Sequence, residues 1–487
     1  MKRIFLAIIT LMFVTTISMA QSGITWSAPI PVATNVSGNY YPRITLDAAG
    51  NALVLWGHSN RAMFSRWNGT TFSAPIMLNT ATVSIASAYW MGPQIASKGD
   101  TVYVVMKRID EAIDTNRLFI THSFNGGATF SPISQFGYIG GNNSRFPTVT
   151  IDNTGNPVVG YMKFDSLSGL ASWAVFRSND YGNTFSTDVA ASGWTGGSVC
   201  NCCPGTIVTS GNTVAMLYRN VLGPIRDMWT GISTDGGTTF TNGFEIDHSN
   251  WNLTSCPASG PDGVIIGDSL YSTFMSGAVG TDFVYYSKAS ISNLNAGAAV
   301  QITGDFPGLV IQNFPRIANS GSAVAMAWKQ NVYNVDQLGF QFTNNISNGF
   351  PPLFDTVAMN NITTVDVAVG QGTVHVVWED DNAGVVMYRK GTFTPMTTGI
   401  HQNIPNGFIV NIYPNPANTF LNIHCSDAQF STLNSQLIIT DILGNEVYKG
   451  TLNGLDNAIA VSTWNAGIYF YEIRGETSNI RGKFVKE

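Results

Sequence analysis

Charged side chains are scarce in this sequence. Asp, Glu, Lys and Arg make up 11% of 487 residues, about half the usual share, and the net charge is −6. A nucleic-acid-binding protein concentrates Lys and Arg on one face to neutralise phosphates, and no such basic cluster is present. We therefore expect no nucleic-acid partner.

Long apolar runs and helical periodicity are also missing after the first twenty residues. No long stretch repeats apolar residues at helical spacing, and none could cross a bilayer. Instead the chain has 49 Gly, and Thr, Ser, Asn, Val and aromatic residues are plentiful. This composition favours strands joined by tight turns, so an all-β fold is expected.

The first twenty residues, "MKRIFLAIITLMFVTTISMA", have the composition of an export signal. Lys2 and Arg3 precede an apolar core, and small residues precede Gln21. This pattern predicts a secretory signal peptide at 1–20, cleaved before Gln21. The alternative is a membrane anchor, but the apolar core is short for a spanning helix. We expect the mature protein to have no membrane span and to enter an oxidising compartment.

The stretch "YYPRITLDAAGNALVLW" (40–56) recurs as "NFPRIANSGSAVAMAWK" (313–329). Similar phrases recur about every fifty residues, the length of a propeller blade. The units begin near Tyr41-Pro42, Gly92-Pro93, Phe146-Pro147, Cys203-Pro204, Cys256-Pro257, Phe314-Pro315 and, without the Pro, Thr364. The repeat predicts a β-propeller.

A second signature lies between the third and fourth strands of several units. It reads "SFNGGATF", "SNDYGNTF" and "STDGGTTF", with Asn125, Asp180 and Asp235 at the same place, and "SRWNGTTF" (65–72) is a degraded copy. The Asx side chain can accept from amides of its own turn, and the Gly can adopt positive φ. These turns resemble the Asp-boxes of sialidase-type β-propellers, and the resemblance covers about 25–400. In that family the Asp-box is structural.

The resemblance leaves the number of blades open between six and seven. Sialidases have six blades, whereas seven units are counted here, and we favour seven. The stretch "GITWSAPIPV" (23–32) resembles the fourth strand after "TTFSAPIML", so it is expected to complete the last blade and close the ring. The predicted propeller domain spans 21–400.

The composition changes after about Thr398. "NIYPNPANTFLNI", "LIITDILGNEVYKG", "WNAGIYFYEI" and "GKFVKE" resemble the C-terminal sorting domain of the type IX secretion system. Short alternating strands independently predict a small β-sandwich at 401–487. The resemblance implies an address read by the type IX secretion machinery. The protein would then be exported through the periplasm and either secreted or held at the outer cell surface.

Arg43 and Arg316 occupy equivalent positions in their units, directly after the Pro of the repeated phrase. We call this position the slot. The equivalent slots elsewhere are Gln94, Thr148, Gly205 and Ala258. Propellers usually bind ligands on the face where first strands enter the channel, and a guanidinium is well suited to a carboxylate. In a closed ring these arginines would flank blade seven and its Glu379.

The sialidase resemblance implies a cluster of three arginines, a Tyr–Glu nucleophilic pair and an acid/base Asp. Arg219 or Arg226 would complete the arginine cluster, and Glu379 would pair with Tyr41 or Tyr218. The sequence departs from that family because Pro precedes Arg43, and only Glu111, Glu245 and Glu379 are available before the tail.

Three alternatives therefore stay open: a glycan hydrolase, a non-catalytic glycan-binding or adhesion module, and arginines that only bind carbonyls and acids of the protein. Asp110, Glu111, Asp380 and Asp381 are interpreted as solvated loop charges. A calcium site at Asp380 and Asp381 would lack a loop signature.

Four of the five cysteines lie at the entrances to units four and five: Cys200, Cys202, Cys203 and Cys256. In an exported protein two disulfides are expected, with the pairing open. The alternative is a zinc or copper site, with His248 as a further ligand, although the Cys-x-Cys-Cys spacing does not match a zinc finger. Cys425 in the tail is expected to be a free thiol. No cofactor is predicted.

Overall fold

The computed structural model describes residues 22–33, 38–88, 90–109, 117–137, 143–164, 170–194, 197–395, 410–425, 435–474 and 479–487. The predicted signal peptide and the pair Asp110 and Glu111 lie outside these residues. The chain divides into two compact units, Met1–Pro395 and Met396–Glu487, which are described separately. Among the described residues, no helix is long and apolar enough to cross a membrane.

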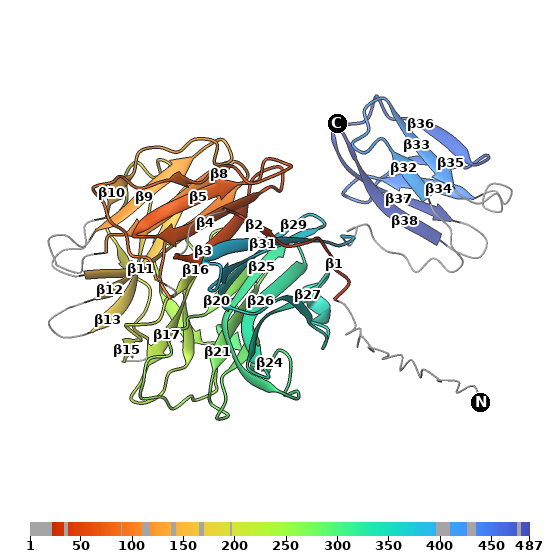
Figure 1. Ribbon diagram of the computed structural model, residues 1–487. Helices are drawn as coiled ribbons and strands as arrows, with labels where there is room; N and C mark the ends of the chain where they lie inside the picture. Colours follow the sequence, from red (N-terminus) through yellow and green to blue (C-terminus); the bar gives the residue numbers. More distant parts are fainter. Residues whose placement is uncertain are drawn as a thin grey trace, which may run out of the picture. The chain divides into compact units, whose positions relative to one another are not determined.

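The described part of the larger unit forms seven antiparallel sheets, one for each unit of the sequence repeat (Figure 1). The first three sheets contain β3 (Asn39–Leu46), β4 (Ala52–His58), β5 (Arg61–Arg66) and β6 (Ile76–Met77); β7 (Gln94–Lys98), β8 (Thr101–Lys107), β9 (Leu118–Ser123) and β10 (Ser134–Phe136); and β11 (Asn143–Ile151), β12 (Pro157–Phe164), β13 (Ala171–Arg177) and β14 (Val189–Ala190).

The fourth and fifth sheets contain β15 (Ser198–Val199), β16 (Thr206–Ser210), β17 (Thr213–Val221), β18 (Met228–Ser233) and β19 (Asn242–Glu245); and β20 (Asp262–Ile266), β21 (Ser269–Ser276), β22 (Phe283–Ser290), β23 (Asn295–Ala296) and β24 (Val300–Gln301). The sixth contains β25 (Leu309–Ser320), β26 (Ala323–Val332), β27 (Val335–Thr343) and β28 (Asp355–Met359), with the short 3₁₀ helix η1 (Ile346–Asn348) before β28. The seventh contains β29 (Ile362–Gly370), β30 (Thr373–Asp380), β31 (Val385–Thr392), β1 (Thr25–Trp26) and β2 (Ile30–Pro31).

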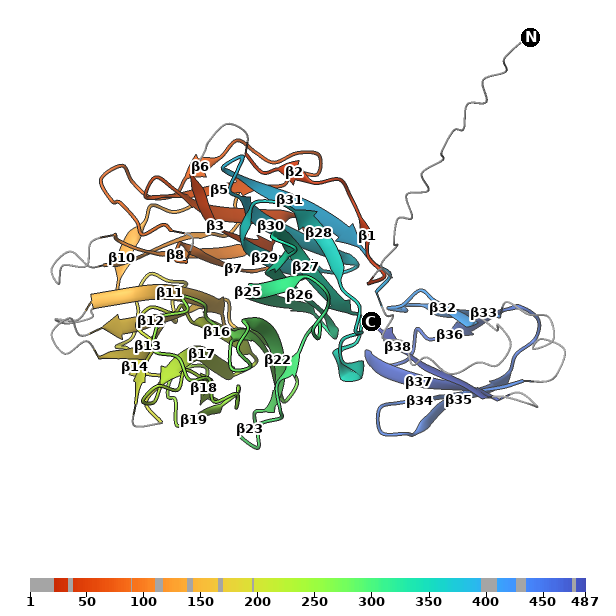
Figure 2. The same ribbon diagram turned by 60° about the horizontal axis from the view of Figure 1, so that its bottom comes forward.

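The seven sheets are arranged in a closed ring. The first long strands β3, β7, β11, β16, β20, β25 and β29 each lie against the next, and β29 lies against β3. Figures 1 and 2 show these strands around the centre, with the later strands of each sheet outside them. Apolar clusters fill the spaces between neighbouring sheets; one joins Val54 and Trp56 of the first sheet to Val377 of the last. The expected β-propeller is confirmed.

The N-terminal segment closes the ring, as the sequence predicted. β1 and β2 both pair with β31, with Thr25 opposite Thr392 and Ile30 opposite Tyr388. Trp26 donates from Nε1 to Asp355 of the sixth sheet at 2.8 Å. The last sheet is therefore built from both ends of the propeller sequence, and this pairing closes the ring.

The three repeated turns share one hydrogen-bonding scheme. In the turn of Asp180, the carboxylate accepts from the Ser178 hydroxyl at 2.8 Å and the Thr184 amide at 2.8 Å. The turns of Asn125 and Asp235 repeat these contacts with Ser123 and Thr129, and with Ser233 and Thr239. Each turn also brings a Phe against the cores between sheets: Phe130, Phe185 and Phe240. These turns therefore contribute to the packing between neighbouring sheets.

The smaller unit has two antiparallel sheets. One contains β32 (Val410–Tyr413), β33 (Phe420–Cys425) and β36 (Asp456–Ala460), and the other contains β34 (Gln436–Thr440), β35 (Glu446–Thr451), β37 (Gly467–Arg474) and β38 (Asn479–Lys486). A single apolar core lies between them, with Leu421, Ile439 and Phe484 fully buried. This arrangement is a small β-sandwich.

The candidate ligand-binding mouth and the cysteine cluster

A bulge in the first strand of several sheets shapes one end of the channel. The pairing register shifts between Tyr40 and Arg43, and again between Asn313 and Arg316. The aromatic residue at each bulge has positive φ, 57° at Tyr41 and 50° at Phe314, a conformation uncommon for a bulky residue. Phe146 of the third sheet repeats it at 48°. All three side chains line one pocket at the channel mouth.

This pocket is narrow. Its cavity is about 40 Å³, and its lining includes Tyr41, Arg43, Trp90, Phe146, Pro204, Ser259, Arg316 and Thr364. Ligand pockets for drug-sized molecules hold roughly 300–1,000 Å³, whereas a site for one water needs about 10–15 Å³. The mouth therefore has room for a few waters or one small anionic group, and a whole sugar ring does not fit inside it.

Arg316 lies between two carboxylates from the neighbouring sheets. Its Nη1 is 3.7 Å from Asp262 and its Nε is 3.4 Å from Asp366. Its guanidinium makes no hydrogen bond to a described residue, and its buried Nε has no hydrogen-bond partner. Burial lowers the pKa of Arg316, but the two carboxylates outweigh burial and raise it above its usual value. Its charge is thus compensated within the protein.

Arg43 is buried at the mouth. Its side chain is 5% exposed, and it donates from Nε to Gln94 Oε1 at 3.2 Å and from Nη1 to the Pro42 carbonyl at 2.9 Å. The guanidinium lies 3.6 Å above the centre of the Tyr41 ring. Among the described residues it forms no ion pair. Burial, followed by the positive charge of Arg316, lowers the pKa of Arg43, and Tyr41 and the Asp366 carboxylate offset this lowering only in part.

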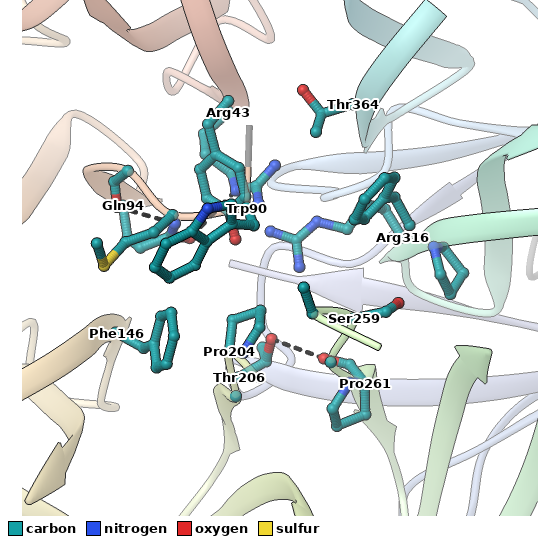
Figure 3. A pocket seen from close by; sticks show the side chains of 18 of the residues that line it. Arg43, Trp90, Gln94, Phe146, Pro204, Thr206, Ser259, Pro261, Arg316 and Thr364 are labelled. Atoms are coloured by element: carbon teal, nitrogen blue, oxygen red, sulfur yellow. Dashed lines mark hydrogen bonds between the residues drawn. The ribbon is translucent and has the colours of Figure 1, made fainter. Parts of the chain in front are cut away.

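Both guanidinium groups lie at the mouth of the channel. Figure 3 shows Arg43 and Arg316 pointing toward one another, with the Trp90 ring beside them. The arginines come from the first and sixth sheets and both line the pocket.

Two aspartates at the mouth were missed by the sequence comparison. The N–H of Ile317 donates to Asp262 and the N–H of Ile44 donates to Asp366, so these aspartates hold the slots of sheets five and seven. In sheet four, the Ile207 N–H donates to Thr148 of sheet three, which places Thr206 in the slot.

The alignment that put Gly205 and Ala258 in the slots of sheets four and five is therefore wrong. The signal for the acids was present, since "PDGVII" and "VDVAVG" carry Asp where "PRITL" carries Arg.

Glu379 does not contact a tyrosine hydroxyl in the described part of the chain. Its Oε2 accepts from the Tyr41 backbone N–H at 3.2 Å and from the Thr364 hydroxyl at 2.9 Å. Desolvation by burial raises the pKa of Glu379 to about 7. Tyr218 is fully buried in the core between sheets three and four, and burial raises its pKa as well. Glu379 thus holds the bulge of the first strand.

Arg219 and Arg226 do not join the two arginines at the mouth. Arg219 is 1% exposed and donates to the carbonyls of Ser259, Arg226 and Met275. Arg226 donates to the carbonyls of Gly223 and Ile225.

The aspartates proposed for calcium also have local partners. Asp380 accepts from the amides of Asn382 and Ala383 in its own turn, and Asp381 accepts from the Thr363 hydroxyl.

The four cysteines of units four and five form one cluster. Cys202 and Cys256 are joined by a disulfide, whereas Cys200 and Cys203 are buried thiols whose sulfurs lie 3.1 Å apart. All four sulfur atoms lie within 4.8 Å of one another. Of the two disulfides expected, the structure contains one. His248 is not part of the cluster, and its ring lies 3.5 Å from Glu245. The side chain of Cys425 lies outside the described ones.

Comparison with known proteins gives one family match, at the C-terminus. Residues 411–487 match the family described as secretion system C-terminal sorting domain. No curated protein sequence matches the chain.

Several solved structures are similar at low identity. The GH93 α-L-arabinofuranosidase of Fusarium graminearum in complex with arabinobiose has 11% identity and a TM-score of 0.45, and the match covers 76% of this chain and 98% of that one. Trypanosoma rangeli sialidase in complex with the inhibitor DANA has 12% identity and a TM-score of 0.41, over 96% of this chain and 88% of that one. PorZ, a surface component of the type IX secretion system of Porphyromonas gingivalis, has 13% identity and a TM-score of 0.38, and the match covers 94% of this chain and 61% of that one.

These values are too low for any of the three structures to indicate what this chain binds. The match at 411–487 and the ring of sheets before it nevertheless define the organisation of the protein. It is a β-propeller followed by a type IX secretion sorting domain, which marks it for export to the cell surface or beyond.

Proposed function

We propose that the propeller binds acidic glycans or other carboxylate-bearing surface polymers at the channel mouth, without hydrolysing them. The observation that carries the proposal is Arg43, a buried guanidinium with no ion-pair partner among the described residues, at the wall of a small cavity. A buried charge without a partner is costly, and a ligand carboxylate would offset that cost.

The geometry of the mouth suits one carboxylate rather than a whole sugar. Arg316 faces Arg43 with hydrogen-bond donors that no described residue accepts. A carboxylate between the two groups would accept charge-assisted hydrogen bonds from both and would reduce their mutual repulsion. The sugar ring would then lie above the cavity, where Trp90 offers an aromatic surface.

A hydrolase is the second candidate, and the geometry gives it less support. The enzyme would need a nucleophile and an acid/base at the bond that breaks. Glu379 is occupied by the Tyr41 amide and the Thr364 hydroxyl, and the Tyr41 ring lies under Arg43. Neither side chain has the arrangement of a nucleophilic pair. We therefore favour the non-catalytic alternative.

The test is calorimetric binding of the exported protein to polygalacturonate fragments and to a sialylated oligosaccharide, with uncharged fragments of equal length for comparison. We expect acidic ligands to bind and Arg43→Ala to weaken binding by about tenfold to a hundredfold, the effect of one charge-assisted contact. Arg61→Ala removes the same charge from an exposed position of the same sheet and serves as the matched control.

Released sugar is measured in the same samples. Binding without release supports the proposal. Release that is lost in Arg43→Ala would identify a hydrolase, and an absence of acidic-glycan binding by the folded protein would contradict both candidates.

A further inference from the structure

The cysteine cluster combines a disulfide, two thiols and an open pocket in one place. Cys200 and Cys203 are 5% and 1% exposed, whereas Cys256 is exposed at the surface and Cys202 is half-buried. A cavity of about 300 Å³ adjoins the cluster and is lined by Cys200, Cys202, Cys256 and Arg226. A purely structural bridge requires neither a neighbouring pair of thiols nor an open approach to one of its sulfurs.

The distances place a potential nucleophile against the disulfide. Sγ of Cys200 is 3.4 Å from Sγ of Cys202, which is one of the two bridged sulfurs. On its other side, Sγ of Cys200 is 3.1 Å from Sγ of Cys203. A thiol in contact with a disulfide sulfur exchanges with it when the thiol is ionised, since the thiolate is the attacking species.

The surroundings of Cys200 favour its ionisation. The hydrogen bond with Cys203 lowers the pKa of Cys200, against the opposing effect of burial, and the Cys202 amide and the charges of Arg219 and Arg226 lower it further. Burial raises the pKa of Cys203, which therefore remains the hydrogen-bond donor of the pair. The two thiols thus have different roles: Cys200 is the nucleophile, and Cys203 donates a hydrogen bond to it.

We propose that these four cysteines form a thiol–disulfide exchange site, in which the Cys200 thiolate attacks Sγ of Cys202 and releases Cys256 to the pocket. An electron pair of the Cys200 sulfur forms the new Cys200–Cys202 bond. The Cys202–Cys256 bond breaks, and its electron pair leaves on Cys256 as a thiolate. The step is neutral in electrons, because Cys200 is oxidised and Cys256 is reduced.

The released thiolate defines the class of reactant that the pocket takes. Cys256 would attack a low-molecular-weight disulfide such as oxidised glutathione, form a mixed disulfide with one half and release the other half as a thiolate. The buried thiols Cys200 and Cys203 would exchange with disulfides in solution only through Cys256, because both are themselves covered. This activity is independent of the glycan-binding mouth.

The experiment is alkylation of the native exported protein by iodoacetamide without reductant, followed by peptide mapping of labels and disulfides. We expect Cys256 to be labelled and Cys200 to be found bonded to Cys202. Cys200→Ser removes the attacking thiol and should slow labelling of Cys256 by about tenfold or more. Cys425→Ser makes the same substitution at the cysteine outside the cluster, in the smaller unit, and is the matched control, with Cys256 labelling within about threefold of the unaltered protein.

A second readout needs no variant. Because exchange starts from the Cys200 thiolate, the rate of Cys256 labelling should rise with pH to half its maximum near pH 6, where the pKa of Cys200 lies, and level off above it. A free Cys thiol of ordinary pKa would give a midpoint near pH 8.5.

Three outcomes would overturn the proposal. Two complete disulfides in the native protein would make the cluster a structural brace. Labels on Cys200 or Cys203 with the Cys202–Cys256 bridge intact would show thiols that do not exchange. Stoichiometric zinc or copper, with all four cysteines protected from alkylation, would identify a metal centre.

Discussion

The carboxylate of Asp366 accepts a hydrogen bond from the backbone N–H of Ile44, 2.9 Å away, and so joins the last sheet of the ring to the first. Asp262 makes the same contact with the Ile317 N–H at 3.0 Å. At each of these two junctions, a carboxylate on the inner strand of one sheet accepts a hydrogen bond from a backbone N–H of the next sheet in the ring. Because both carboxylates also face Arg316, the mouth and the joints between sheets share the same residues.

Replacing Asp366 should destabilise the whole propeller. Asp366→Ala leaves the buried Ile44 N–H without an acceptor and removes one of the two carboxylates near Arg316. The first effect costs about 1–3 kcal/mol and the breakage of a buried ion pair about 3–5 kcal/mol. Because Arg316 keeps its second carboxylate, Asp262, the loss should be smaller than the sum, and we expect about 3–5 kcal/mol. Urea unfolding followed by tryptophan fluorescence measures this loss.

Asp305→Ala is the control for that substitution. Asp305 is exposed, and a surface change of this kind is expected to alter the free energy of unfolding by no more than about 0.5 kcal/mol. Equal midpoints for Asp366→Ala and Asp305→Ala would mean that the contact with Ile44 does not hold the ring.

Ring closure by the N-terminal strand gives a second prediction. Ile24 is 2% exposed and belongs to the apolar cluster between the sixth and seventh sheets, whereas Thr25 next to it is exposed. Ile24→Ala should lower the free energy of unfolding by about 2–4 kcal/mol, as expected for a large side chain removed from a core. Thr25→Ala changes the exposed neighbouring residue, the first of β1, and should leave the urea midpoint nearly unchanged. A similar midpoint in both variants would contradict closure by this segment.

Much of this fold could be predicted because the repeat is local. Each unit carries its own turns and strands, so the phrase around Arg43 and its copy around Arg316 identify equivalent strands without knowledge of long-range contacts. The pairing of 23–32 with the last sheet was also predictable, because its sequence resembles another fourth strand. The sorting domain was recognisable from its own motifs.

The chemistry of the mouth was less predictable, because it depends on contacts between units. In the fifth unit the repeat offers two prolines, and the alignment used Pro257 instead of Pro261, which precedes Asp262. In the seventh unit, which lacks the Pro, a bulge of one residue between Ile362 and Val365 precedes Asp366. The sequence likewise could not tell that Glu379 would bind the Tyr41 amide instead of a tyrosine hydroxyl. Disulfide pairing in a four-cysteine cluster is similarly undetermined by spacing.

The two compact units predict separable roles. A chain that ends at Pro395 lacks the sorting domain but keeps every described strand of the propeller. We expect this shorter chain to retain the urea midpoint of the propeller and to accumulate in the periplasm. Urea unfolding of both chains checks the predicted stability, and cell fractionation checks the predicted location. Surface delivery of the shorter chain would contradict the role of 411–487 as the address.

Glu379 predicts how the stability of the propeller depends on pH. Burial raises the pKa of Glu379 from 4.5 to about 7, so between these values the folded state keeps a proton that the unfolded chain has lost. Stability from this group is therefore present below about pH 4.5, falls as the pH rises toward 7, and is constant above that range. Glu379→Gln keeps an oxygen acceptor for the Tyr41 amide but cannot ionise. The urea midpoint should consequently decrease less between pH 5 and pH 8 in the variant than in the unaltered protein. Because Asp247, whose pKa burial raises to about 6, is present in both proteins, its contribution cancels in the comparison. An equal fall in both would show that Glu379 is ionised throughout this range.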